Sequence, residues 1–281
     1  MWPKRYPMAC LLFLALTPPL LSGQVPWEKL AIADSLYQAE AYEPALEHYE
    51  PVLKYYSEKK ALIKAARCAA LLKNEPVALR YLKRAAKLGL SNARVLQSDT
   101  KLASLRENPG FLKLLADVEE FETRAKNLGS PELLSKLDSI YADYQKYRGR
   151  KPDEAAQAKL DSLNLRRIEQ LIAKHGWLGS NLLTGRNYCW LVIQHQPLEV
   201  QKKYHGLMAK AVKKGEEDPA FLASLEDRMQ VSQGKAQRYG TQVDLKERRI
   251  YPIKNPEKVD FYRAKVGLGS IEALRKKFET D

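Results

Sequence analysis

Residues 41–54 read AYEPALEHYEPVLK, and the architecture of the first half of the chain follows from this stretch. Ala45, Tyr49 and Val52 are apolar residues that recur at the spacing of one helix face. Pro44 suits the first turn of a helix, where no backbone N–H is needed. The stretch therefore predicts a helix that begins near Pro44 and buries one apolar stripe.

The same pattern returns 33 positions later in the chain. Ala33, Leu36, Ala45, Tyr49 and Val52 correspond to Ala66, Ala69, Ala78, Leu82 and Ala85, and the last three recur as Phe111, Leu115 and Val118. The breaks before the second helix of each unit fall at Glu43-Pro44, Glu75-Pro76 and Asn108-Pro109. Each unit reads as a helical hairpin that buries its face against the next one. Residues 27–122 are therefore predicted to form an α-solenoid of about three helical hairpins.

The segment around Tyr42, Ala45, Tyr49 and Val52 resembles the tetratricopeptide repeat, over about two repeats and a degenerate third. The usual Trp-x-x-Leu-Gly opening of that repeat is absent. The resemblance implies a concave surface for a protein or peptide partner. The alternative is that so short an array only braces the next domain, because solenoids need about three repeats to stand alone.

Residues 1–23 have the pattern of a secretory signal peptide. Lys4 and Arg5 precede an apolar run, and the small residues Ser22 and Gly23 suit a cleavage point. The run is shorter than the ~20 residues of a transmembrane helix, although an uncleaved anchor is the alternative. We expect export, and a periplasmic or extracellular location after cleavage.

Two regions of different charge follow the signal segment. Residues 24–129 carry 17 basic and 14 acidic residues, whereas residues 130–281 carry 28 and 20, within a chain of 281 residues and net charge +13. The 45% apolar content excludes wholesale disorder. The basic residues are interleaved with acids, so no nucleic-acid partner is expected, but contact with anionic envelope surfaces is compatible with the charge.

The second region reads as a mostly helical α+β domain, which makes the chain mainly α. After a charged helical connector with a stripe of Leu133, Leu137, Ile140 and Tyr144, helices are expected over 153–174, 187–195, 197–214, 219–232 and 270–278. Residues 238–243 and 248–253 are rich in β-branched and aromatic residues, which predicts a hairpin near 237–253.

The common catalytic and ligand motifs are missing from the chain. It has no phosphate-binding glycine loop, no paired C-x-x-C and no two histidines four residues apart, so neither a metal nor a cofactor is expected. Three cysteines cannot form a disulfide scaffold. Cys68 and Cys189 are predicted to be separate buried thiols, and a disulfide between them in an oxidising compartment is the alternative.

The stretch LEDRMQVSQGKAQRYGTQ, residues 225–242, resembles an uncharacterised bacterial domain family with an LxDR…GxxQxYGTQ signature. The matching residues are Leu225, Asp227, Arg228, Gly234, Gln237, Tyr239, Gly240, Thr241 and Gln242, and Arg263, Gly267 and Leu268 match its Arg-x-x-x-Gly-Leu end. The resemblance covers roughly residues 150–275 and implies a domain, without a reaction.

Three residues are candidates for catalysis. His195 is a general acid or base in one interpretation and a hydrogen-bonded core residue in the other. Arg228 stabilises an anion or holds the carbonyls of the hairpin. Asp227 lies on the side of its helix opposite the buried stripe, as a catalytic, solvated or loop-capping carboxylate.

Four uncharged polar residues, Gln237, Tyr239, Thr241 and Gln242, are the candidates for ligand binding. Alternation along a strand would place the first three on one face and Gln242 on the other. Such a row of side chains either binds a polar ligand or supplies the hydrogen bonds that a buried turn needs.

The favoured interpretation is an exported binding or scaffold protein of the bacterial cell envelope. Its helical repeats would bind a protein, and the second domain would carry a polar recognition surface around Tyr239. The rival is a hydrolase with His195 as base, Arg228 as anion stabiliser, and Gln237 and Tyr239 as substrate readers, which requires these side chains to meet in one cavity. A third interpretation is an accessory subunit held in a larger envelope complex through the repeats.

Overall fold

The computed structural model describes residues 25–148 and 152–279. The architecture is mainly α, with a small two-stranded antiparallel sheet near the C-terminus, and the predicted fold class is confirmed. The predicted signal peptide lies outside the described residues. Within the described ranges, no helix is both long and apolar enough to cross a membrane.

The N-terminal half is a series of packed helices. They are α1 (Glu28–Gln38), α2 (Tyr42–Leu53), α3 (Lys59–Leu71), α4 (Glu75–Ala86), α5 (Ala93–Ser98), the short 3-10 helix η1 (Thr100–Leu105) and α6 (Pro109–Leu128). Proline lies in the first turn of α2, α4 and α6, as the sequence predicts. In the third unit the first helix is replaced by α5 and η1, so only two full hairpins precede α6.

The 33-residue spacing marks the core of this half. Tyr49, Leu82 and Phe111 are each completely buried, as are the small residues Ala66 and Ala78. Small residues allow neighbouring helices to approach closely, and the larger ones fill the space between them. The first core draws on residues from Val25 to Val118.

The C-terminal half begins at the end of α6. Its elements are α7 (Pro131–Gln145), α8 (Glu154–His175), α9 (Tyr188–Gln194), α10 (Leu198–Lys213), α11 (Pro219–Val231), β1 (Val243–Asp244), β2 (Arg249–Ile250), η2 (Pro256–Lys258), α12 (Val259–Lys265) and α13 (Ile271–Glu279). The stripe predicted on the connector is buried in α7. The second core runs from Leu128 to Leu225, so it begins close to the boundary expected at residue 129.

The predicted β-hairpin is much shorter than expected. Only Val243 pairs with Ile250 and Asp244 with Arg249, and Gln237 makes an isolated parallel bridge to Ile253. Residues 238–242 form a turn instead of a strand, so the expected alternation of their side chains is wrong. The reason is a long-range contact to a buried carboxylate of α11, which a local pattern does not reveal.

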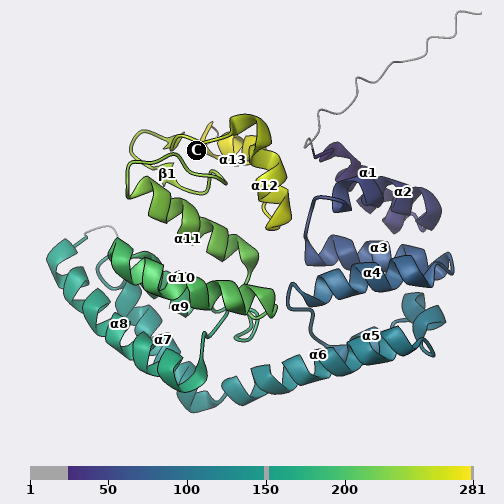
Figure 1. The fold of residues 1–281 in the computed structure, drawn as a ribbon, viewed down its shortest axis with the longest axis horizontal. Coiled ribbons are helices and arrows are strands. Elements are labelled where there is room, and N and C mark those ends of the chain that lie inside the picture. The colour runs from purple at the N-terminus through teal and green to yellow at the C-terminus, as the bar shows by residue number, and fades with distance from the viewer. Residues whose placement is uncertain (1–24, 149–151, 280–281) are drawn as a thin grey trace, which may run out of the picture.

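Figure 1 shows the helices arranged as an open arc, in which α6 runs along the base and joins the two halves. The halves meet again beside α6, where Gly215 has a φ of 75° and a Cβ would lie 2.9 Å from the carbonyl oxygen of Ala86. Asn181 Nδ2 donates to the Gly215 carbonyl (3.0 Å), and Arg124 forms an ion pair with Glu216. Glycine is needed at position 215 for both its conformation and its size.

A second contact lies at the open end of the arc. The Ser57 N–H donates to the Ala264 carbonyl of α12 (2.9 Å), and the rings of Tyr55 and Phe261 meet edge to face with centroids 5.7 Å apart. Ala264 is fully buried and belongs to the first core. The N-terminal helices are therefore fixed to the C-terminal half at two places.

The two described cysteines are free thiols, and the prediction of separate buried residues is confirmed. Cys68 lies in the first core and Cys189 in the second. Burial raises the pKa of Cys68 to about 11 and that of Cys189 to about 12.

Candidate functional site

A buried carboxylate organises the turn at residues 238–241. Asp227 of α11 has no exposed surface, and its Oδ1 accepts hydrogen bonds from the N–H groups of Arg238 (2.7 Å) and Tyr239 (3.0 Å). Its Oδ2 accepts from the N–H (3.0 Å) and the hydroxyl (2.9 Å) of Thr241. Gly240, with φ of 69°, turns the chain around the carboxylate. This is the geometry of the loop-capping alternative for Asp227.

Two glutamine side chains tie this turn to its surroundings. Gln237 is fully buried, and its Nε2 donates to the carbonyls of Gln242 and Tyr251, both at 2.9 Å. Gln237 Oε1 accepts from the Gln242 N–H (2.8 Å), and Gln242 Nε2 donates to the carbonyl of Ser224 (3.2 Å). In this conformation Gln237, Gln242 and Thr241 make hydrogen bonds within the domain, and their ligand-binding role stays a prediction.

Arg263 holds the outer side of the turn. This side chain of α12 is 5% exposed, and it donates to the carbonyls of Tyr239 (2.8 Å) and Gly269 (2.6 Å). The sequence offers Arg228 as a holder of these carbonyls, but Arg263 fills that position. Burial, with a contribution from the nearby Glu226, raises the pKa of Tyr239 to about 12, so its hydroxyl stays protonated near neutral pH.

A groove of about 510 Å³ opens beside Tyr239, and we call it the His205 groove. Its polar lining comes from α10, α11, the turn, the segment between β2 and η2, and α12, and includes His205, Glu226, Asp227, Gln230, Arg238, Lys254, Asn255 and Tyr262. Its volume lies within the range of ligand pockets. Of the signature residues, Asp227 lines the groove and holds the backbone at Arg238.

An imidazole–carboxylate pair lies on one side of the groove. His205 Nε2 is 2.9 Å from Glu226 Oε1, and both side chains are 34% exposed. An ionised carboxylate only accepts hydrogen bonds, so Nε2 carries the hydrogen, and Nδ1 has a lone pair in the neutral form of the ring. A carboxylate that fixes a histidine tautomer in this way is the arrangement of a base and its orienting partner.

Two cationic side chains lie in the same groove. The Arg238 guanidinium is 4.2 Å from the centre of the Tyr262 ring and 5.6 Å from that of Tyr239, a cation–π arrangement that restricts its orientation. The backbone of Lys254 is fixed because its N–H donates to the Gln237 carbonyl (2.8 Å). Neither Arg238 nor Lys254 forms an ion pair within the described residues, whereas Glu226 and Asp227 accept hydrogen bonds from His205 and from the turn, so the two cations are available to an anionic ligand.

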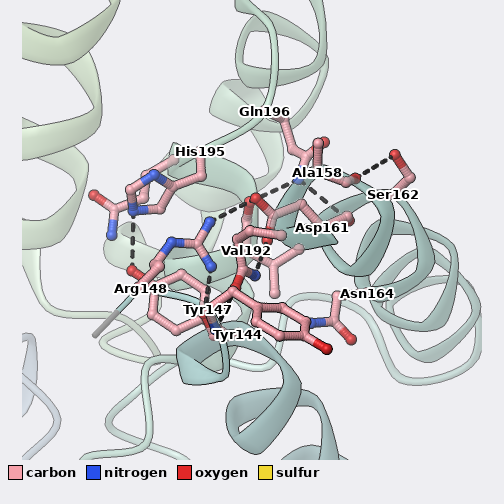
Figure 2. A network of polar contacts seen from close by, with 12 residues as sticks. Tyr144, Tyr147, Arg148, Ala158, Asp161, Ser162, Asn164, Val192, His195 and Gln196 are labelled. Carbon is pink, nitrogen blue, oxygen red and sulfur yellow. Dashed lines mark hydrogen bonds and ion pairs between the residues drawn. The ribbon is translucent and has the colours of Figure 1, made fainter. Parts of the chain in front are cut away.

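His195 belongs to a different cluster, which Figure 2 shows. Its Nε2 lies 2.9 Å from the Tyr144 hydroxyl, and Arg148, with its guanidinium 4.1 Å from the centre of the Tyr144 ring, pairs with Asp161 at 2.5 Å. His195 ends α9 and remains exposed at the surface. Partial loss of hydration, and then the charges of Arg148 and Arg228, lower the pKa of His195 to about 4. The ring is therefore neutral at pH 7.

The three side chains required by the hydrolase interpretation do not meet in the His205 groove. Arg228 acts electrostatically on Tyr144 and His195, and its buried Nε has no hydrogen-bond partner among the described residues. Tyr239 instead contacts Tyr262 and Arg238. Helix positions two apart point in nearly opposite directions, at about 200°. Arg228 and the groove residue Glu226 therefore lie on opposite sides of α11.

Apart from Asp227, the residues that line the His205 groove were not among the sequence candidates. His205 lies ten positions before Gly215, and Glu226 lies ten positions after Glu216. In an antiparallel helix pair that turns at these two residues, such positions face each other. This symmetry is the signal that could have revealed the His205–Glu226 pair.

The comparisons with known proteins identify a domain without assigning its activity. Residues 151–280 match the family described as "Family of unknown function (DUF6624)". No curated protein and no solved structure shows a significant match to the chain. The match spans the His205 groove and most of the second core, whereas the N-terminal helices lie outside it.

Proposed function

We propose that the chain is an exported binding protein of the bacterial cell envelope, in which the His205 groove recognises an anionic group of a small ligand. The observation that carries this proposal is the placement of Arg238 and Lys254 in one groove, where neither has an ion pair within the described residues and both lining carboxylates, Glu226 and Asp227, already accept hydrogen bonds. The N-terminal helices brace this domain through the contacts at Gly215 and Ser57.

The rigidity of the groove supports a binding function. The backbone at Arg238 is fixed by Asp227, and the backbone at Lys254 is fixed by Gln237. Preorganised side chains lose little entropy when a ligand binds. A guanidinium held in one orientation also favours the two-pronged recognition of a carboxylate or phosphate.

Isothermal titration with inorganic phosphate, glucuronate and neutral glucose tests this proposal. We expect one of the anions to bind and glucose not to bind. Arg238→Gln should weaken the anion at least about tenfold, because a hydrogen bond to a charged group contributes about 1.5–3 kcal/mol. Lys235→Gln is the matched control, since Lys235 is exposed, near the same turn and outside the groove. Equal affinities of the two variants, or no binding by any anion, would contradict the proposal.

The expected location is tested separately. N-terminal sequencing of the protein from a fractionated bacterial host should find a chain that starts near Gln24 in the periplasm or medium. Accumulation of the uncleaved chain in the cytoplasm would contradict the proposed location in the cell envelope.

A protein partner for the helical repeats is a second part of the proposal. Within residues 25–148 and 152–279, seven large hydrophobic residues are exposed, and five of them lie in the N-terminal half: Ile32, Leu71, Leu72, Val95 and Leu112. Exposed apolar side chains favour protein contacts when they gather in a patch. If this half recruits a partner, Leu71→Asp with Leu72→Asp should abolish co-purification of that partner and leave phosphate or glucuronate binding unchanged.

The hydrolase interpretation is retained as the alternative, with the catalytic base moved to His205. The Glu226 contact, which leaves Nδ1 free to accept a proton, is the observation that favours it. Turnover of an ester or phosphoester that is lost in His205→Asn and kept in His195→Gln would favour an enzyme. Ligand binding without turnover would favour the binding protein.

A further inference from the structure

A second hollow lies where the two halves of the chain meet, and we call it the junction pocket. It has a volume of about 420 Å³ and is lined by residues of α4, α6 and the end of α10. The docking of Gly215 against Ala86 fixes these walls relative to each other. The α10 side of the pocket, with Lys213 and Lys214, is thus present only while the two halves are in contact.

The floor of the junction pocket is apolar. Leu90, Leu114 and Val118 have exposed fractions of 5%, 4% and 2%, and Phe121 is half-buried beside them. All four residues pack against one of the two cores or belong to it. The floor therefore offers hydrocarbon surface that a ligand could cover without leaving buried polar groups unpaired.

The rim of the same pocket is cationic, because its lining holds five lysines and one carboxylate, that of Asp117, which pairs with Lys113 at 3.3 Å. Four exposed lysines lie at the C-terminal ends of two helices: Lys83 and Lys87 at the end of α4, and Lys213 and Lys214 at the end of α10. None of the four has an ion pair within residues 25–148 and 152–279. Lysines at the ends of α4 and α10 also complement the helix dipoles. Dipole interactions act within each helix and do not explain why both pairs face one hollow with an apolar floor.

We infer that the junction pocket binds a single-chain amphipathic anion, with the hydrocarbon chain on the floor and a carboxylate at the lysine rim. The apolar floor matches the hydrocarbon chain of such a molecule, and the lysine ammonium groups without an ion pair match its carboxylate. Each methylene removed from water should strengthen binding about fourfold. Affinity should therefore rise with chain length until the pocket is filled.

Titration calorimetry with laurate, below the concentration at which it forms micelles, tests the inference on the full chain. Laurate should bind more tightly than octanoate because of its longer chain. Dodecyltrimethylammonium has the same chain length and the opposite charge, and it should bind at least tenfold more weakly than laurate. Equal binding of the two surfactants would overturn the inference.

Variants locate the site. Lys87→Gln combined with Lys214→Gln should weaken laurate at least tenfold, whereas Lys126→Gln combined with Lys210→Gln is a matched control on α6 and α10 outside the pocket. Circular dichroism checks that both double variants keep their helices. Unchanged laurate affinity in the first pair would refute the assignment.

A membrane surface is the competing explanation for the lysines. Sedimentation with phosphatidylglycerol vesicles, measured beside the laurate titration, separates the two. Binding to vesicles without binding of monomeric laurate would show a surface attraction and overturn the pocket. Loss of laurate binding in the rim variant, with phosphate or glucuronate binding intact, would show that this site is independent of the His205 groove.

Discussion

Replacing Asp227 by alanine tests the contact on which the groove depends. The substitution removes the acceptor of three backbone N–H groups and one hydroxyl, of which only the bond from the Tyr239 N–H is completely buried. A buried donor left without a partner costs about 1–3 kcal/mol, and water reaches the donors of Arg238 and Thr241 more easily. We therefore expect a total loss of about 3–5 kcal/mol in the free energy of unfolding.

Urea unfolding followed by circular dichroism measures this loss. In thermal unfolding it corresponds to a drop of roughly 6–20 °C, at about 2–4 °C per kcal/mol. Asp227→Asn should fall between the two proteins, because its amide keeps one acceptor oxygen and turns an NH₂ group towards the other donors. Glu199→Ala, at an exposed carboxylate of α10, is the control and should change stability by less than about 1 kcal/mol. A loss below about 1 kcal/mol in Asp227→Ala would refute the view that this carboxylate holds the turn.

Three further predictions follow from burial and backbone geometry. Gly215→Ala should destabilise the protein by about 1–3 kcal/mol more than Gly234→Ala, since the two glycines have similar positive φ values (75° and 68°) but only Gly215 would place a Cβ against backbone; equal urea midpoints would contradict this. The folded-state pKa of His195 is about 4, below its ordinary value near 6.5, so the free energy of unfolding should fall as the pH drops from about 6.5 to about 4, where the unfolded chain takes up the proton and the folded chain does not. His195→Gln should reduce that fall in urea titrations. An unchanged dependence on pH would count against the shift. In a variant in which Cys10 is replaced by serine, Cys68 and Cys189 should react with DTNB only after unfolding, because burial raises both thiol pKa values and blocks access. Rapid labelling of the native chain would show exposed thiols and contradict this.

Local sequence patterns predicted the helices well. Pro44, Pro76 and Pro109 each lie in the first turn of a helix, because the fixed φ of proline and its missing N–H act within a single turn. The stripe from Leu133 to Tyr144 is buried in α7 because a helix presents every third or fourth residue to one neighbour.

Contacts between distant segments were beyond such patterns. Residues 238–242 have the composition of a strand, yet the carboxylate of Asp227 holds them as a turn, and hydrogen bonds to a buried charge outweigh a weak strand preference. His195 and Arg228 were chosen for their chemistry, whereas the His205–Glu226 pair depends on the alignment of two helices. Side-chain chemistry alone did not show which polar residues share a groove.

The contact between Ser57 and Ala264 also sets an order of events during synthesis. Ala264 belongs to the first core, although the chain must be synthesised as far as residue 264 before this residue is available. The first helices are therefore synthesised before their core is complete, because Ala264 of α12 is not yet present to pack against them. Because closing so long a loop is entropically costly and slow, the nascent N-terminal half should remain dependent on chaperones until α12 arrives.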